Sequence, residues 1–363
     1  VAMKIKDSFK KKPHRNDLVE IEKTLESGTL SGKSDTVEKF ESMIAERFGV
    51  ENVVCCSSGT SALMASLIAE GVSQDDEVLV PCYTTIPTTF PILSVGAKPV
   101  FVDTKSPYTI ELSVDDLLSK VSDKTKAIIL VPLWGYPINY DEVSCACKNL
   151  GITVIDDAAQ AHFSTNSEGQ LLGTFSDYGC FSLHDKKILS TGEGGFIIPS
   201  SQEKLDRLRE VINLGNLRGI AYGLNFKLGS LQAALGISRI GRVNDELATR
   251  KLNADKIKAG LINTNFEEIS FEGQPNYYNL VLKAKDHQDL NNVHESLKSM
   301  GFETDFVKYG EAKYKFGILN GFYDGRIVHG NTVLENLITI PTHPDLTQKD
   351  ITYIVEMLEK VSC

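Results

Sequence analysis

The sequence predicts an α/β fold with a large domain, built on a mostly parallel central sheet flanked by helices, and a smaller C-terminal α+β domain. From about residue 50 to residue 240, short apolar segments alternate with helical patterns, which is typical of a parallel sheet covered by helices. At 363 residues the chain exceeds the size at which single cores usually stop growing, so we expect a second domain. The expected strands cover residues 77–80, 99–102, 127–133, 153–155 and 196–198.

We divide the chain into residues 1–15 as an N-terminal tail, 16–242 as the large domain and 243–363 as the small domain. The tail is basic from Lys4 to Arg15 and is interpreted as solvated, because no apolar segment of a targeting sequence follows it. The elements expected in the small domain are a helix over 243–261, a strand over 277–282, a helix over 290–300 and a last helix over 351–358, capped by Thr347 and Asp350.

An amphipathic helix is predicted over Asp35–Phe48. Its apolar residues at positions 37, 40, 43, 44 and 48 share one face. Asp35 and Glu38 have the spacing of a capping box, and Gly49 follows as a stop signal.

The charge balance excludes several classes of protein. The net charge is −10, from 38 basic and 48 acidic residues, which disfavours binding to nucleic acid or to an anionic membrane. The longest apolar segments have the length of buried strands and are too short to span a bilayer. Seven cysteines without regular disulfide spacing indicate reduced thiols and a cytoplasmic protein, and no second Cys/His pair accompanies the Cys-x-Cys at 145–147, so we expect no metal site.

A lysine-bearing loop carries the clearest chemical signal. Residues 181–195 read Phe-Ser-Leu-His-Asp-Lys-Lys-Ile-Leu-Ser-Thr-Gly-Glu-Gly-Gly. A lysine can act as a covalent catalyst where burial or neighbouring charge lowers its pKa. Most lysines are solvated surface residues, but this loop lies between apolar segments and its glycines permit close backbone approach. The loop alone does not distinguish Lys186 from Lys187.

Two carboxylates, Asp156 and Asp157, follow the apolar strand at 153–155. They are expected at the carboxyl edge of the sheet, where α/β proteins bind their ligands. A cofactor with a basic ring nitrogen needs such an anion to stay protonated. The alternative is that both residues cap a following helix.

A third segment, Ser57–Leu63, reads Ser-Ser-Gly-Thr-Ser-Ala-Leu and opens a helix that ends near Gly71. The unpaired N–H groups and the positive dipole at such a helix start suit a phosphate. Ordinary N-capping by Ser58 or Thr60 is the alternative. The segment has neither the P-loop spacing nor that of a dinucleotide fingerprint.

In this order and at these separations, the three segments resemble the DegT/DnrJ/EryC1/StrS family of sugar aminotransferases, which depend on pyridoxal 5'-phosphate (PLP) and have the fold-type-I architecture. The resemblance covers about residues 15–250, and Ile-Pro-Thr-His-Pro-Asp-Leu-Thr at 340–347 also fits. The family pattern S-F-H-x-x-K-x-x-x-x-G-E-G-G aligns on Ser182, His184 and Lys187. The resemblance therefore assigns the Schiff base to Lys187 and implies pyridoxamine phosphate as the intermediate form of the cofactor.

The resemblance implies a role for each further matching residue. The family's E-D-A-A-Q-A appears here as Asp-Asp-Ala-Ala-Gln-Ala, which places Asp157 at the pyridinium nitrogen and Gln160 at the ring. Ser182 would bind the phosphate together with Gly59 and Thr60.

A homodimer with shared active sites is also implied. The family's G-x-N-Y-R-M-x-x-x-Q-A-A appears as Gly-Leu-Asn-Phe-Lys-Leu-Gly-Ser-Leu-Gln-Ala-Ala from Gly223 to Ala234. In the family the asparagine of this pattern, here Asn225, reaches the phosphate bound by the neighbouring subunit.

Two segments depart from the family pattern. Thr85 stands where the family usually has an aromatic residue that stacks on the cofactor, and nearby Tyr83 is interpreted chiefly as a core residue. Asp305–Tyr309 reads Asp-Phe-Val-Lys-Tyr where many members that use nucleotide sugars have an H-Y-P-type segment. His184 and Trp134 are further candidates for the substrate pocket, with simple packing as the alternative for Trp134.

The resemblance predicts a transaminase that transfers an amino group, usually from L-glutamate, to a keto or aldehydo sugar in amino-sugar biosynthesis. A nucleotide-linked deoxysugar is the first expectation for the acceptor, and a nucleotide-free sugar such as a 3-deoxy-octulosonate, or an aminocyclitol ketone, is the alternative. A deoxysugar dehydratase of the same family would carry a histidine in place of Lys187. The remaining alternative is a noncatalytic, PLP-binding regulatory protein.

Overall fold

A seven-stranded sheet forms the centre of the computed structural model, which describes residues 5, 11–286, 290–309, 317–322, 326–330 and 332–362. The strand order is β1-β7-β6-β5-β4-β2-β3. From β3 to β6 all neighbouring strands are parallel, whereas β7 runs antiparallel to both β1 and β6. The strands are β1 (Val54–Cys56), β2 (Glu77–Pro81), β3 (Lys98–Val102), β4 (Thr125–Leu130), β5 (Thr153–Asp157), β6 (Tyr178–Ser182) and β7 (Gly195–Pro199).

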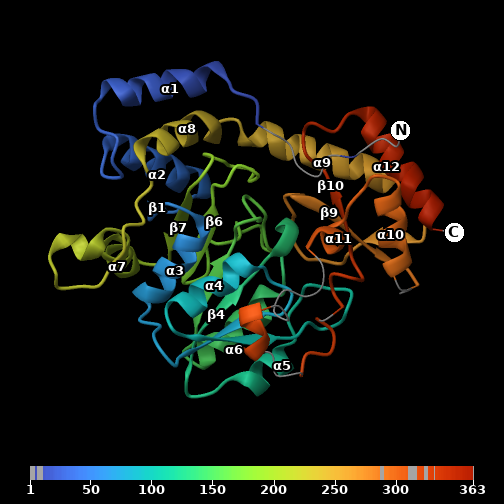
Figure 1. Ribbon diagram of the computed structural model, residues 1–363, viewed down its shortest axis with the longest axis horizontal. Coiled ribbons are helices and arrows are strands. Elements are labelled where there is room, and N and C mark those ends of the chain that lie inside the picture. The colour runs from blue at the N-terminus through green and yellow to red at the C-terminus, as the bar shows by residue number, and fades with distance from the viewer. Residues whose placement is uncertain are drawn as a thin grey trace.

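Helices cover this sheet, as Figure 1 shows, and the predicted α/β class is confirmed. α3 packs on β6 and β7, while α1 and α2 both pack on α8. The helices of this region are α1 (Arg15–Glu26), α2 (Asp35–Phe48), α3 (Gly59–Ala69), α4 (Ile86–Ser94), α5 (Val114–Lys120), α6 (Tyr140–Asn149), α7 (Gln202–Ile212) and α8 (Ser230–Ile240), with short 3-10 turns η1 (Leu133–Gly135) and η2 (Leu214–Leu217).

A second, antiparallel sheet of order β10-β9-β8 forms from the C-terminal third of the chain. The long helix α9 (Val243–Ala259) leads towards it and packs against α12 (Figure 1). The division at residue 243 stays a prediction. The elements are β8 (Phe266–Glu268), β9 (Asn279–Ala284), β10 (Ile338–Pro341), α10 (Asn291–Ser299), α11 (Asp305–Tyr309), η4 (Gly317–Phe322) and α12 (Gln348–Val361).

Local capping decides where two helices begin. For α2 the predicted limits are right but the predicted cap is wrong, because Ser34 rather than Asp35 accepts the N–H of Val37. Gly49 ends this helix with φ of 66°, a left-handed conformation that glycine adopts without a Cβ penalty. For α12 the predicted capping pair is confirmed, since Thr347 and Asp350 form a reciprocal capping box.

The N-terminal tail is exposed at residues 12–15, as expected, but not at Lys11. α1 begins at Arg15, and its buried Asp17 forms ion pairs with Arg239 of α8 and with Arg242, which lies between α8 and α9. Ahead of this helix, the Lys11 side chain is only 12% exposed and is bonded to partners far along the chain. The many charged residues of this segment concealed the contacts it makes.

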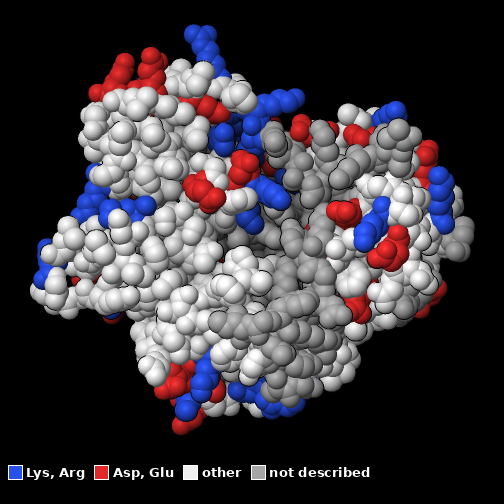
Figure 2. Space-filling view, viewed as in Figure 1, with Lys and Arg blue, Asp and Glu red and all other residues white. Residues whose placement is uncertain are grey.

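Acidic and basic side chains lie interspersed on the face shown in Figure 2. None of the helices in the described part of the chain is long and apolar enough to cross a membrane. The cysteines at 55, 56, 82, 145, 147 and 180 are free thiols. Within the described residues, no group of three or more His, Cys, Asp or Glu side chains is placed to hold a metal ion.

Candidate active site

A cavity of about 460 Å³ lies at the carboxyl edge of the parallel strands. The segments that follow β2, β4, β5 and β6 meet there, because the carboxyl ends of parallel strands share one edge. The start of α3 forms one wall, and residues from α9, β9 and α11 complete the lining. The predicted site residues that line the cavity are Gly59, Thr60, Tyr83, Thr85, Trp134, Asp157, Gln160, Ser182, His184 and Lys187.

Lys187 lies in the loop between β6 and β7, and both Lys187 and Tyr278 line the cavity. Its Nζ is 5.3 Å from the centre of the Tyr278 ring. Desolvation lowers the pKa of Lys187 to about 8, an effect opposed by the carboxylate of Asp157 and strengthened by the charge of Lys186. Near pH 8, a large share of the Lys187 amines is therefore neutral and nucleophilic. Lys186, in contrast, is exposed.

The two carboxylates at the end of β5 point to different surroundings, as alternation along a strand requires. Asp157 lines the cavity, where it accepts hydrogen bonds from the Thr88 hydroxyl at 2.7 Å and the Ala159 N–H at 3.3 Å. Burial raises the pKa of Asp157, and the hydrogen bond from Thr88 and the charge of Lys187 oppose that rise. This carboxylate would be stabilised by a cation in the cavity.

Asp156 lies on the other side of the strand. It accepts a hydrogen bond of 2.8 Å from the Tyr140 hydroxyl, and burial raises its pKa to about 7. The helix-capping interpretation of the two aspartates is wrong, because a turn rather than a helix follows β5.

The start of α3 combines a cap with a close backbone contact. Ser58 caps the helix by accepting the Ser61 N–H at 3.0 Å, which confirms the N-capping interpretation for this residue. A Cβ on Gly59 would lie 2.8 Å from the Cβ of Ser182, and a Cβ on Gly195 would lie 2.5 Å from the carbonyl carbon of Ser58. The glycines thus bring the first turn of α3 against the end of β6, with Gly59, Thr60 and Ser182 all on the cavity.

Tyr83 and Thr85 follow β2. Tyr83 is 2% exposed, and its hydroxyl donates to the carbonyl oxygens of Ile110 and Val131 at 2.9 and 3.0 Å, so it is anchored in the core as expected. Thr85 precedes α4 and lines the cavity without an aromatic ring.

Trp134 connects two sides of the cavity. Gln160 accepts its backbone N–H and Asp305 accepts its indole N–H, both at 2.7 Å. Trp134 has φ of 58°, a left-handed conformation that is rare for a bulky residue and is found most often at functional sites. Gln160 thus holds the backbone of Trp134 from the β5 side, and Asp305 of α11 holds its ring.

We expect the change Asp305→Ala to lower the free energy of unfolding by about 1–3 kcal/mol, because the buried indole N–H of Trp134 loses its acceptor. Trp134 is the single tryptophan of the sequence, so the change in its fluorescence emission reports directly on this contact. Asp305→Asn, which keeps an acceptor oxygen, is the matched control and should retain most of the wild-type emission. Identical spectra for wild type and Asp305→Ala would contradict this contact.

Among the residues that sequence reasoning missed, Arg250 and Tyr278 line the cavity, and Thr88 donates a hydrogen bond to the Asp157 carboxylate that lines it. Thr88 lies 69 positions before its partner Asp157, and no local pattern relates the two. Arg250 belongs to a charged helix that resembles a solvated one, yet it is only 3% exposed. Only the folded chain brings these residues of separate segments to one site.

Asn225 lies outside the cavity of its own chain. It is exposed, forms a bridge with Asn213 and accepts a hydrogen bond from Lys227. Its expected contact with a neighbouring subunit stays a prediction.

Comparison with known proteins agrees with this geometry. The model of the DegT/DnrJ/EryC1/StrS aminotransferase family matches residues 12–359. GDP-perosamine synthase of Escherichia coli O157:H7 is 28% identical over 352 residues, which cover 94% of each chain. dTDP-3-amino-3,4,6-trideoxy-alpha-D-glucose transaminase of Micromonospora megalomicea subsp. nigra is 31% identical over 254 residues, covering 68% of this chain and 67% of that protein.

Among solved structures, the sugar aminotransferase CalS13 from Micromonospora echinospora superposes with a TM-score of 0.88 at 26% identity, covering 98% of this chain and 99% of that one. The resemblance carried by the lysine loop, the paired aspartates and the start of α3 is thereby confirmed. This chain belongs to the DegT/DnrJ/EryC1/StrS aminotransferase family.

Proposed function

We propose that this protein is a PLP-dependent aminotransferase of amino-sugar biosynthesis, which transfers an amino group from L-glutamate to a keto or aldehydo carbon of a nucleotide-linked deoxysugar. The observation that carries the proposal is one cavity that combines the Lys187 amine, the buried Asp157 carboxylate and the first turn of α3. The names of both sequence relatives refer to sugars linked to a nucleotide, which supports that class of acceptor.

The residues of the cavity fit the two polar ends of PLP. At one end, Gly59, Thr60 and Ser182 offer the N–H groups of a helix start and a hydroxyl to the phosphate. The close approach of Gly59 to Ser182 leaves no room for a side chain there. At the other end, Asp157 offers a buried carboxylate to a protonated ring nitrogen, which is the cation this carboxylate requires.

Lys187 and Asp157 have separate roles in this proposal. When bound, PLP supplies an aldehyde and an electron-withdrawing ring that acidifies the carbon bearing the amino group. The neutral Lys187 amine would act as the base that accepts this proton, and the ammonium so formed would be the acid that returns it. Asp157 keeps the ring nitrogen protonated, and the Thr88 hydroxyl at 2.7 Å holds the carboxylate in place.

The pH dependence of PLP capture tests the state of Lys187. Because the neutral amine is the nucleophile, we expect the rate at which PLP-free protein captures PLP to rise with pH and to level off above about pH 8. The rate is measured by the change in PLP absorbance after mixing. Lys187→Arg, which keeps the charge but stays protonated, should show no capture at any of these pH values. A capture rate that stays constant from about pH 6 to about pH 9, a range that includes the pKa of Lys187, would contradict this assignment.

A half-reaction assay tests the function itself. PLP-loaded protein mixed with L-glutamate should release 2-oxoglutarate. A second mixing, with a panel of keto and aldehydo sugars, should restore the absorbance spectrum that the PLP-loaded protein had before glutamate was added. Restoration by nucleotide-linked sugars alone supports the proposed acceptor, whereas restoration by octulosonates or cyclitol ketones alone replaces it with the nucleotide-free class. Bound PLP without release of 2-oxoglutarate would instead indicate a noncatalytic protein.

We also place Asn225 at a subunit interface, as part of a homodimer with shared active sites. Its exposure and its position outside the cavity of its own chain support this placement. Mixing an inactive Lys187→Ala chain with an inactive Asn225→Ala chain should then restore activity in a fraction of the mixed dimers.

A further inference from the structure

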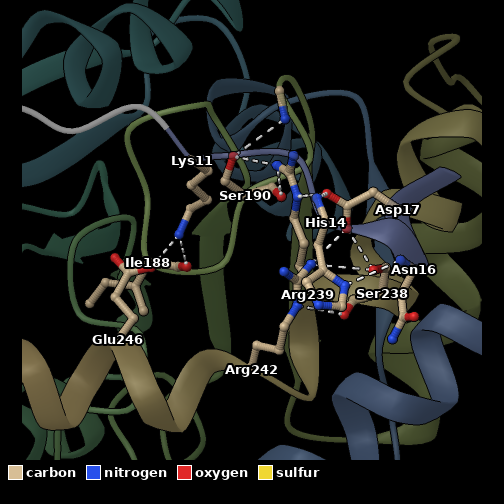
Figure 3. A network of polar contacts seen from close by, with 11 residues as sticks. Lys11, His14, Asn16, Asp17, Ile188, Ser190, Ser238, Arg239, Arg242 and Glu246 are labelled. Carbon is tan, nitrogen blue, oxygen red and sulfur yellow. Dashed lines mark hydrogen bonds and ion pairs between the residues drawn. The ribbon is translucent and has the colours of Figure 1, made fainter. Parts of the chain in front are cut away.

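Two cationic side chains donate hydrogen bonds to backbone carbonyl oxygens of the segment that follows Lys187. Lys11, which precedes α1, donates to the carbonyl oxygen of Ile188 at 2.6 Å. Arg239 of α8 donates to the carbonyl oxygen of Ser190 at 2.9 Å. Ile188, the residue next to Lys187, and Ser190, three positions after Lys187, are thereby held by side chains that do not line the cavity, and Figure 3 shows both contacts.

Each of these cations has an acidic partner on a neighbouring helix. Lys11 pairs with Glu246 of α9, and Arg239 lies 3.7 Å from the carboxylate of Asp17 in α1. The Lys11 and Glu246 side chains are only 12% and 10% exposed. A buried pair that is fully hydrogen-bonded holds its geometry far better than an exposed one.

Glu246 extends the contact to the cavity itself. Its second oxygen accepts two hydrogen bonds from Arg250, at 2.9 and 3.0 Å. Arg250 lines the cavity and donates to the carbonyl oxygen of Tyr278 at 3.1 Å. The ring of Tyr278 is the one that lies 5.3 Å from the Lys187 amine.

Two contact chains thus start at Lys11 and end at Lys187. One runs directly through Ile188, the residue next to it in sequence, and the other runs through Glu246, Arg250 and Tyr278 to its side chain. The first chain of contacts holds the backbone next to Lys187, and the second reaches Tyr278, whose ring lies near the Lys187 amine.

We propose that Lys11 is a positioning residue for the reaction, which sets the location of the Lys187 amine through the Ile188 carbonyl and through the Glu246–Arg250 pair. Lys11 does not line the cavity, so it acts through the residues that it contacts. The inference rests on the proposed role of Lys187 in transamination. It assigns to the N-terminal segment a part in catalysis that its distance in sequence from the lysine loop conceals.

The test compares Lys11→Met with Lys12→Met in the full chain. Met removes the charge and the donor but keeps most of the length of the side chain, and Lys12 is an exposed neighbour of Lys11. We expect kcat of the PLP-loaded Lys11→Met protein to fall roughly 10- to 100-fold, as for a misplaced reacting group, with KM for both substrates little changed. Lys11→Arg should restore most of kcat, because it keeps the charge and the donor, and Lys12→Met should behave as wild type.

Hydrogen exchange gives a readout that does not depend on activity. Without PLP, the peptide covering residues 183–195 should exchange faster in Lys11→Met than in wild type or Lys12→Met, while peptides from α12 should not change. Wild-type kcat together with wild-type exchange in Lys11→Met would overturn the proposal, as would a rise in KM alone. If the Met variant does not fold, Lys11→Gln, which keeps a donor without the charge, undergoes the same two measurements.

A failure of the proposed function is recognised separately. If the wild-type protein releases no 2-oxoglutarate from L-glutamate, the transaminase assignment fails, while the exchange measurement still decides whether Lys11 orders the Lys187 loop. If the wild-type protein is active and the Lys11 and Lys12 variants are indistinguishable, only the positioning role fails.

Discussion

The variant Lys187→Ala is expected to lose turnover by roughly 10²- to 10⁴-fold or more, because it removes both the nucleophile and the proton carrier of the site. The half-reaction with L-glutamate, followed by release of 2-oxoglutarate, measures this loss. Lys186→Ala is the matched control, since Lys186 is the adjacent lysine and is exposed. Turnover of Lys186→Ala should stay close to that of wild type. The pKa of Lys187 should rise slightly in this variant, because the neighbouring positive charge is removed.

A second measurement separates loss of chemistry from loss of structure. The circular dichroism spectrum of Lys187→Ala should match that of wild type without PLP and its Tm should not fall, because burial lowers the pKa of the Lys187 amine and its charged form therefore costs free energy in the folded state. Equal losses of turnover in the Lys186 and Lys187 variants would refute the assignment of the reactive lysine.

The variant Asp157→Asn is expected to change activity and stability in opposite directions. Turnover should fall by about 100-fold, since a neutral amide does not hold a ring nitrogen in its protonated form. Without PLP, however, Tm at pH 7–8, roughly the range where ordinary carboxylates are fully ionised, should rise or stay equal. Burial raises the pKa of Asp157, so its ionised form costs free energy in the folded state, and this cost is present above the ordinary carboxyl pKa and disappears at lower pH.

The neighbouring aspartate provides the control for this experiment. Asp156 lies on the opposite side of β5, where it is bonded to Tyr140 and has a pKa raised to about 7. Asp156→Asn resembles its protonated form and should retain turnover. A lower Tm for PLP-free Asp157→Asn, or an equal loss of turnover in Asp156→Asn, would contradict the proposed role of Asp157.

Local patterns were sufficient to predict the elements that depend on local chemistry. The cap of α12 is one example, because Thr347 and Asp350 satisfy each other within one turn. The end of β5 near Asp157 is another, since an apolar segment followed by polar residues identifies the edge of a sheet, whereas β6 (Tyr178–Ser182) was not among the predicted strands. The family resemblance then assigned the reactive lysine, which spacing within the loop left open.

The unpredicted parts of the site depend on contacts between distant segments. Thr88 reaches Asp157 because α4 begins at the edge of the sheet where β5 ends, and Asp305 reaches Trp134 because α11 lies across the cavity. Lys11 is a third case, since a basic segment ahead of the first helix gives no sign that one of its lysines is buried. In all three, the sequence separation is too long for any periodic pattern to record the contact.

The antiparallel strand β7 has a consequence for how far this site can vary. Gly195, its first residue, is opposite Cys56 at the end of β1 and opposite Ser182 at the end of β6. The same residue therefore fixes the distance between the loop of Lys187 and the helix start at Ser58. A slip of one position in either pairing would move the amine relative to the anion-binding end by the length of a residue, about 3.4 Å. The twelve residues between β6 and β7 (183–194) therefore act as a spacer of fixed length, which holds the Lys187 loop at a set distance from the start of α3.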